Sequence, residues 1–251
     1  MCSWKGLSRK TRKYTEFVCQ RFRAFRVFGE NNSIQNSSKV IKMSIKTNIE
    51  SIRSTLRPGC RLIAVSKTHP PELIQEAYDA GQRIFGENKV QEMVAKYEVL
   101  PKDIQWHLIG HLQSNKVKYI APWVSLIHSV DSPGLAAEID KRGKKVGRVI
   151  PVLLQVHIAR EETKFGFSRE ELLTFVRESK LTNIKIEGLM GMATLTDDTE
   201  QIRKEFRQLH DLFVEIGGMK ELSMGMSNDY KIAMEEGSTM VRIGTAIFGK
   251  R

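Results

Sequence analysis

Residues 62–81 read LIAVSKTHPPELIQEAYDAG, and the order of residue types in them predicts the architecture of the whole chain. The five residues from Leu62 to Ser66 suit a buried strand, and they lead directly to Lys67. The pair Pro70-Pro71 then begins a segment with the apolar spacing of a helix, which Gly81 ends. A strand followed at once by a helix is typical of a βαβ unit, in which helices join parallel strands.

The same alternation of strand and helix patterns recurs along the chain after Met43. Short apolar runs predict eight strands, at 61–67, 83–87, 104–110, 126–131, 149–157, 184–192, 221–226 and 240–245. Helical patterns occupy 45–56, 71–80, 88–99, 114–120, 133–142, 168–179, 199–216 and 229–236. Because the strands are apolar on both faces, helices should cover the outside of a parallel sheet. We predict one α/β domain over residues 43–251, a single (β/α)8 TIM barrel.

The two ends of this region complete the predicted barrel. The last strand ends within a few residues of Arg251, so we expect no helix after it. The helix at 45–56 should then cover that part of the barrel. The mixed-charge helix at 88–99 is expected to present a solvated outer face.

The composition is that of an ordinary globular protein, with 41% hydrophobic and 27% charged residues in 251. No uncharged apolar run approaches the roughly 20 residues that span a membrane. The three cysteines are widely spaced and form no CxxC pair, so we predict neither a disulfide framework nor a metal site. These features indicate a cytoplasmic protein without a membrane partner.

The net charge of +11 is concentrated at the N-terminus. Residues 1–42 hold ten Lys or Arg and two Glu, a net charge of +8, which leaves +3 for residues 43–251. Such an arm can bind phosphate backbones or act as a mitochondrial transit segment. We favour a disordered basic extension, with Met43 as an alternative start, over mitochondrial targeting or nucleic-acid binding.

Lys67 is the first candidate for chemistry, because active sites of TIM barrels lie at the C-terminal ends of the strands. A lysine that is partly desolvated there has a lowered pKa and can form a Schiff base with an aldehyde. The alternative is an ordinary exposed lysine at a strand end.

The last two predicted strands end in residues suited to a phosphate group. Ser227 follows the seventh strand in LSMGMSND, and Gly244 and Thr245 follow the eighth in MVRIGTAIFG. Hydroxyl groups and backbone amides at such turns bind phosphate. Arg242 shares a strand face with Gly244, so it should project into the barrel, where its partner is either a ligand or a neighbouring carboxylate. A lysine, a phosphate cradle and an arginine form the layout of a pyridoxal phosphate site.

A series of motifs, in a fixed order along the chain, indicates a family that has this layout. They are LIAVSKTHP, FGENKVQE, WHLIGHLQSNK, IHSVDS, VLLQVHIAREETKFG, GLMGMATLTDD and LSMGMSNDYKIAMEEGSTMVRIGTAIFG. With them the chain closely resembles the pyridoxal phosphate homeostasis protein family, also called proline synthase co-transcribed proteins, over residues 44–249. Members of this family resemble the N-terminal barrel domain of alanine racemase (fold type III) without its second domain.

The resemblance implies a role for each candidate residue. Lys67 would carry pyridoxal 5′-phosphate as a Schiff base, and Arg242 would face the pyridine nitrogen. Ser227, Gly244 and Thr245 would bind the phosphate. Asn88 and Met224 would line the ring pocket. It also implies that the protein buffers and delivers the cofactor in vitamin B6 homeostasis, with apo-enzymes as recipients and no catalytic residues of its own. An arginine at the pyridine nitrogen disfavours its protonation and weakens the cofactor as an electron sink.

The rival hypothesis is an amino-acid racemase or another pyridoxal phosphate-dependent enzyme, and weak racemase activity stays open. Two-base racemization needs a tyrosine on the cofactor face opposite the lysine, and alanine racemase takes it from its second domain. The five tyrosines of this chain mostly fall in predicted helices away from the barrel mouth, namely Tyr14, Tyr78, Tyr97, Tyr119 and Tyr230.

Three further patterns have simpler interpretations. GTAIFGK at 244–250 matches the core of a P-loop but lacks the Ser or Thr that binds magnesium, and no helix can follow it. His107 and His111 lie in a strand pattern, so we interpret them as structural or pocket-lining rather than metal ligands. Lys164 is kept as a second candidate lysine for the reaction with an aldehyde, in place of Lys67.

Overall fold

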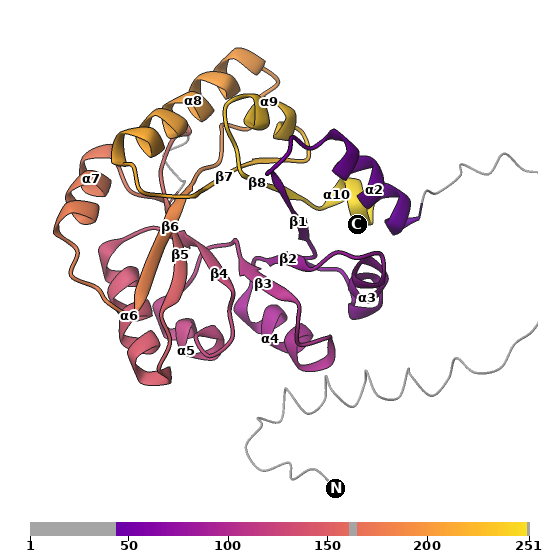
Figure 1. The fold of residues 1–251 in the computed structure, drawn as a ribbon, viewed down its shortest axis with the longest axis horizontal. Helices are drawn as coiled ribbons and strands as arrows, with labels where there is room; N and C mark the ends of the chain where they lie inside the picture. Colours follow the sequence, from indigo (N-terminus) through magenta and orange to yellow (C-terminus); the bar gives the residue numbers. More distant parts are fainter. Residues whose placement is uncertain (1–43, 161–164, 250–251) are drawn as a thin grey trace, which may run out of the picture. The chain divides into compact units, whose positions relative to one another are not determined.

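Eight parallel strands close into a barrel in the computed structural model, which describes residues 44–160 and 165–249 (Figure 1). The strands are β1 (Arg61–Val65), β2 (Ile84–Glu87), β3 (Gln105–Leu108), β4 (Leu126–Val130), β5 (Ile150–Gln155), β6 (Ile184–Met190), β7 (Glu221–Met226) and β8 (Met240–Ile243). They follow one another around the barrel in chain order, and β8 pairs with β1 from Arg61↔Met240 to Ala64↔Ile243. The predicted (β/α)8 TIM barrel is confirmed.

Helices surround the strands, as the alternating pattern predicted (Figure 1). They are α2 (Ile45–Thr55), α3 (Pro71–Asp79), α4 (Val90–Val99), η1 (Ser114–Lys116), α5 (Val117–Ile120), α6 (Pro133–Val146), α7 (Arg169–Glu178), α8 (Thr199–Ile216), α9 (Tyr230–Glu235) and α10 (Thr245–Phe248). In front of α8, the longest of the described helices, the side chain of the N-cap residue Asp198 accepts hydrogen bonds from two backbone N–H groups of the first turn. Ile202, Phe206 and Leu209 then recur at helical spacing and are buried against the barrel.

The expectation that no helix follows the last strand was wrong. Four residues suffice for the single turn of α10, which begins directly after Gly244 and lies within the P-loop-like segment. α2 does cover this part of the barrel, because its Asn48 side chain donates a hydrogen bond to the carbonyl oxygen of Ile247 at 2.9 Å. Figure 1 shows α2 and α10 side by side next to β1.

Two apolar clusters hold the barrel together. The larger one lies between strands and helices, and the smaller one joins one residue from each of five strands, Ile63, Leu126, Leu153, Met190 and Met240. Inward-facing side chains of this kind fill the interior of a small barrel. The interior of the barrel at this level is therefore filled by side chains and is not an open pore.

The interpretations of residues 1–42 and of Lys164 concern segments outside the described residues. Within the described ranges, none of the helices combines the length and the hydropathy that crossing a bilayer requires.

Candidate functional site

A cavity of about 970 Å³ opens at the C-terminal ends of the strands. Six of the seven candidate residues from the sequence line it, namely Lys67, Asn88, Ser227, Arg242, Gly244 and Thr245. They come from the ends of β1, β2, β7 and β8, which the closed barrel brings to one edge. Strand ends that are up to 180 residues apart in the chain therefore form one site.

Lys67 lies in the turn after β1, one residue beyond Ser66. The next residue, Thr68, has a backbone φ of 66°, which is a left-handed conformation that residues other than glycine rarely adopt. A strained conformation persists only where surrounding contacts hold it. Farther along the loop, the His69 ring packs on Phe248 of α10 with 4.8 Å between ring centroids.

A buried ionic cluster of Glu87, Glu92 and Lys96 supplies the contacts that hold this turn. The Lys96 Nζ lies 2.7 Å from the Glu87 carboxylate and 2.6 Å from that of Glu92. Lys96 also donates to the carbonyl oxygen of Ser66 at 2.8 Å, and the Ser66 hydroxyl donates to Glu87 at 2.7 Å.

The cluster reaches both neighbours of Lys67, because the backbone N–H of Thr68 donates to the Glu92 carboxylate at 2.5 Å. The side chains of Lys96 and Glu87 are only 5% and 0% exposed. Burial raises the pKa of Glu87, and the charge of Lys96 opposes that rise. The prediction of a solvated outer face for 88–99 was therefore wrong at Lys96, because α4 turns this residue toward β1 and β2.

Two glycines allow the close approaches that shape the site. A Cβ at Gly110 would lie 2.5 Å from the carbonyl oxygen of Asn88, so only glycine lets the loop after β3 pack against Asn88. A Cβ at Gly244 would lie 3.0 Å from the carbonyl oxygen of Val65. The absence of a side chain there keeps the turn after β8 close to the end of β1, beside Lys67.

Arg242 is buried, with 4% of its surface exposed, and it lines the floor of the cavity. Its guanidinium donates to the Ser223 hydroxyl at 2.6 Å and to the carbonyl oxygen of Gly191 at 3.0 Å. Burial lowers the pKa of Arg242 to about 10, although the charge of Asp229 opposes this shift. Arg242 thus forms its direct hydrogen bonds with neutral oxygens. A carboxylate on a neighbouring strand, one of the two partners that the sequence left open, is not among them.

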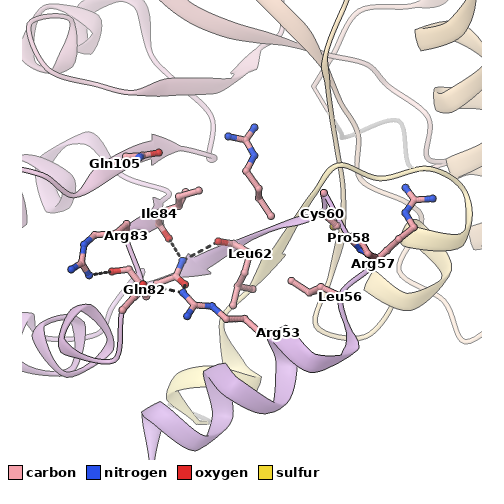
Figure 2. Close-up of a pocket in the computed structure, with 13 residues that line it drawn as sticks. Arg53, Leu56, Arg57, Pro58, Cys60, Leu62, Gln82, Arg83, Ile84 and Gln105 are labelled. Atoms are coloured by element: carbon pink, nitrogen blue, oxygen red, sulfur yellow. Dashed lines mark hydrogen bonds between the residues drawn. The ribbon is translucent and has the colours of Figure 1, made fainter.

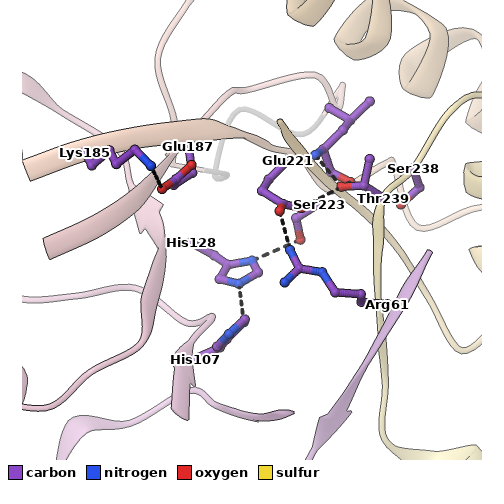
Figure 3. A network of polar contacts seen from close by, with 10 residues as sticks. Arg61, His107, His128, Lys185, Glu187, Glu221, Ser223, Ser238 and Thr239 are labelled. Atoms are coloured by element: carbon purple, nitrogen blue, oxygen red, sulfur yellow. Dashed lines mark hydrogen bonds and ion pairs between the residues drawn. The ribbon is translucent and has the colours of Figure 1, made fainter. Parts of the chain in front are cut away.

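Ser223, which accepts from Arg242, begins a column of hydrogen bonds inside the barrel, and Figure 3 shows its members Ser223, His128 and His107. Ser223 Oγ lies 3.0 Å from His128 Nδ1, and His128 Nε2 lies 3.0 Å from His107 Nδ1. Burial lowers the pKa of His107 to about 3 and that of His128 well below its ordinary value. Both rings are therefore neutral near pH 7, so the positive charge of the column resides on Arg242.

The structure adds residues that the sequence did not single out. Met224, the seventh candidate, is fully buried in the larger core cluster, whereas Met226 lines the cavity. The strand bulges between them, because Gly225 has φ 93° and the pairing of β7 with β8 shifts register between Ser223 and Met226. The loop after β6 also lines the cavity, and the motif GLMGMATLTDD at 188–198 was the signal that could have placed it there.

The other polar candidates lie away from the cavity. His111 pairs with Asp131 at 3.0 Å and stacks on Phe165, with 4.3 Å between ring centroids. Over residues 44–160 and 165–249, no group of three or more His, Cys, Asp or Glu side chains could hold a metal ion. Within the same ranges no tyrosine lines the cavity, and Tyr14 lies outside them.

Comparison with known sequences gives a consistent set of relatives. The family model of the alanine racemase N-terminal domain matches residues 40–251. A pyridoxal phosphate homeostasis protein of Aquifex aeolicus is 46% identical over 198 residues, which cover 76% of this chain and 87% of that protein. The protein of the same name from Schizosaccharomyces pombe is 36% identical over 221 residues, with coverages of 83% and 93%.

Solved structures agree with these relatives. PipY of Synechococcus elongatus, solved with PLP bound, superposes with a TM-score of 0.76 at 40% identity, covering 82% of this chain and 100% of that one. An alanine racemase from Bartonella henselae, solved with covalently bound pyridoxal phosphate, gives a TM-score of 0.67 at 16% identity. It covers 82% of this chain and 60% of the racemase, and at that identity the likeness concerns the fold alone.

Proposed function

The chain belongs to the pyridoxal phosphate homeostasis protein family, as its motifs predicted, and from this membership we propose that it binds pyridoxal 5′-phosphate and acts in intracellular vitamin B6 homeostasis. It would buffer the cofactor and deliver it, with residues 43–251 as the binding domain. One observation carries the proposal: Lys67, Arg242 and the turn residues Ser227, Gly244 and Thr245 line the same cavity.

The groups in the cavity fit the cofactor. Pyridoxal 5′-phosphate supplies an aldehyde, which condenses with a primary amine with loss of one water, and a phosphate monoester. Lys67 offers the amine, and Ser227 and Thr245 offer hydroxyl donors to the phosphate. Gly244 lines the cavity without a side chain, so the phosphate can approach its backbone.

Arg242 sets the electronic character that we propose for the site. A guanidinium only donates hydrogen bonds, so a pyridine nitrogen facing it serves as an acceptor and stays unprotonated. The bonds to Ser223 and Gly191 fix its orientation. Asn88 would contact the ring from the β2 side, and we propose Met226 in place of Met224 because Met226 lines the cavity.

We propose a binding protein rather than an enzyme. An unprotonated pyridine nitrogen stabilises a substrate carbanion poorly, and no tyrosine of the described residues lines the cavity for the second proton transfer of a racemase. Delivery implies that apo-enzymes which use the cofactor are the partners. We place this function in the cytoplasm, and nucleic acid has no part in it.

The test is the absorbance spectrum of the full chain after addition of pyridoxal phosphate and removal of the excess. Wild type should keep a visible band, Lys67→Ala should lose it, and Lys89→Ala should keep it as the matched control for an exposed lysine near the site. Absence of a band from wild type would refute the cofactor proposal. A band retained by Lys67→Ala would shift the anchor to another lysine, with Lys164 next to be replaced. Amino-acid-dependent turnover would favour the racemase alternative.

A further inference from the structure

A second hollow, drawn in Figure 2, lies at the N-terminal ends of the strands, whereas Lys67 follows the C-terminal end of β1. It is a cleft of about 460 Å³, and the first residues of β1, β2 and β3 form one wall, with Arg61, Ile84 and Gln105 among them. The last turn of α2 and the turn at 57–60 form the other wall. This volume lies within the range of small-molecule sites.

The cleft has an unusual set of charges. Every charged side chain in its lining is an arginine: Arg53, Arg57, Arg61 and Arg83. The rest of the lining is apolar or amide, with Leu56, Pro58, Leu62, Gln82 and Gln105 as examples. The lining therefore offers many hydrogen-bond donors and positive charge beside an apolar surface.

Carboxylates outside the cleft neutralise two of these arginines. Arg61 forms an ion pair with Glu221, and Arg83 lies 3.4 Å from the Asp103 carboxylate. These two guanidiniums have partners that account for their positions without a ligand.

The other two arginines bond to neutral oxygens. Arg53 donates to the carbonyl oxygen of Gly81 at 3.0 Å and to Gln82 Oε1 at 2.9 Å, the second of which is drawn in Figure 2. Arg57 donates to the carbonyl oxygen of Ser238 at 3.3 Å. Such bonds orient a guanidinium without neutralising it, and each guanidinium has five N–H groups. Arg53 also lies in the last turn of α2, where a cation is favourable, so Arg57 is the more specific indicator of a ligand.

We propose that this cleft binds a small phosphorylated metabolite of about mononucleotide size. Arg57 holds its phosphate, because the planar guanidinium matches phosphate oxygens in pairs. Arg53 adds positive charge from the other side of the cleft, where it bonds to Gln82. Leu56 and Leu62 contact its apolar part. The site is separate from the cofactor cavity, since the two hollows share no lining residue and lie at opposite ends of parallel strands.

The experiment is calorimetric titration of the full chain with AMP at low salt, with adenosine as the uncharged control. We expect saturable binding of AMP and none of adenosine. Arg57→Gln should weaken binding about ten- to a hundredfold, which corresponds to one charge-assisted contact. Arg53→Gln should weaken it by less, because Arg53 contributes charge without contacting the phosphate. Arg177→Gln, an exposed arginine beside Glu178, is the matched control and should bind as wild type.

Three results would overturn the proposal. The first is the absence of saturable binding up to millimolar AMP. The second is binding that survives in Arg57→Gln and Arg53→Gln, which would place AMP elsewhere on this basic chain. The third is loss of binding when the protein is saturated with pyridoxal phosphate, because AMP would then occupy the cofactor cavity. Circular dichroism of each variant establishes that it is folded, and Arg57→Lys, which keeps the charge, should retain part of the affinity.

Discussion

Replacement of Lys96 by methionine tests whether the buried ionic cluster holds the fold beside Lys67. Methionine keeps the length of the side chain and removes the ammonium group that Glu87, Glu92 and the Ser66 carbonyl oxygen share. The Glu87 carboxylate is fully buried, and its Oε2 already has no hydrogen-bond partner. The substitution would leave a buried charge without its cation.

Breaking a buried ion pair from one side costs about 3–5 kcal/mol, so we expect the free energy of unfolding to fall by that amount. For a domain of this size the loss corresponds to a fall in Tm of about 6–20 °C. Lys46→Met is the matched control, because Lys46 and Glu50 are 68% and 61% exposed at 4.0 Å, and such a pair is worth about 0.5 kcal/mol or less. Urea denaturation at pH 7 measures both.

The pH dependence of Lys96→Met gives an independent check. Without Lys96 the pKa of Glu87 rises further, since burial raises it and the opposing charge is gone. When the pKa of a group is higher in the folded than in the unfolded protein, its contribution to stability is fully present at pH values below the unfolded pKa. That contribution is lost as the pH rises through the folded pKa. The variant should therefore lose more stability at pH 8 than at pH 5, and adding Glu87→Gln should restore at least half of the loss. A loss below about 1 kcal/mol, no larger than for Lys46→Met, would refute the reasoning.

The remaining predictions concern the histidine column and the cavity. Because the pKa values of His107 and His128 are lowered in the folded protein, the free energy of unfolding should fall as pH falls below about 6.5, by up to about 2 kcal/mol per ring at pH 5. His128→Gln should remove the part of this pH dependence that His128 contributes, as measured by urea denaturation at pH 7 and pH 5. A wild type and variant with the same pH dependence would contradict the buried neutral pair. Gly110→Ala should cost about 1–3 kcal/mol of stability and weaken pyridoxal phosphate binding in a spectroscopic titration, because its Cβ would displace Asn88; unchanged affinity would show that Asn88 does not contact the cofactor. Thr245→Val should weaken binding about tenfold or more while the absorbance maximum of the bound cofactor stays in place, and a shifted maximum with unchanged affinity would place the hydroxyl near the ring instead of the phosphate.

Much of the barrel could be predicted because its signals are local. Each strand and helix has its own periodicity, and the bounds of 199–216 and 221–226 agree with α8 and β7. Six of the other seven predicted strands extend too far at the C-terminal end, by two residues at Lys67 and at Thr245, whereas 83–87 ends with β2 at Glu87. Apolar spacing does not mark where pairing stops, since the residues after a strand can be as apolar as the strand itself.

The sequence alone determined three features, because each depends on residues that are close together in the chain. They are the position of Lys67 at a strand end, the hydroxyl and glycine turns after the last two strands, and the family. Only the tertiary structure decided that Lys96 is buried beside Ser66, that neutral oxygens bind Arg242, and that Met226 rather than Met224 lines the cavity. Those outcomes depend on which helix face meets the barrel and on a register shift in β7. Contacts between residues distant in the chain set both, 30 positions apart for Lys96 and Ser66 and 16 for Met226 and Arg242, and apolar spacing does not encode such contacts.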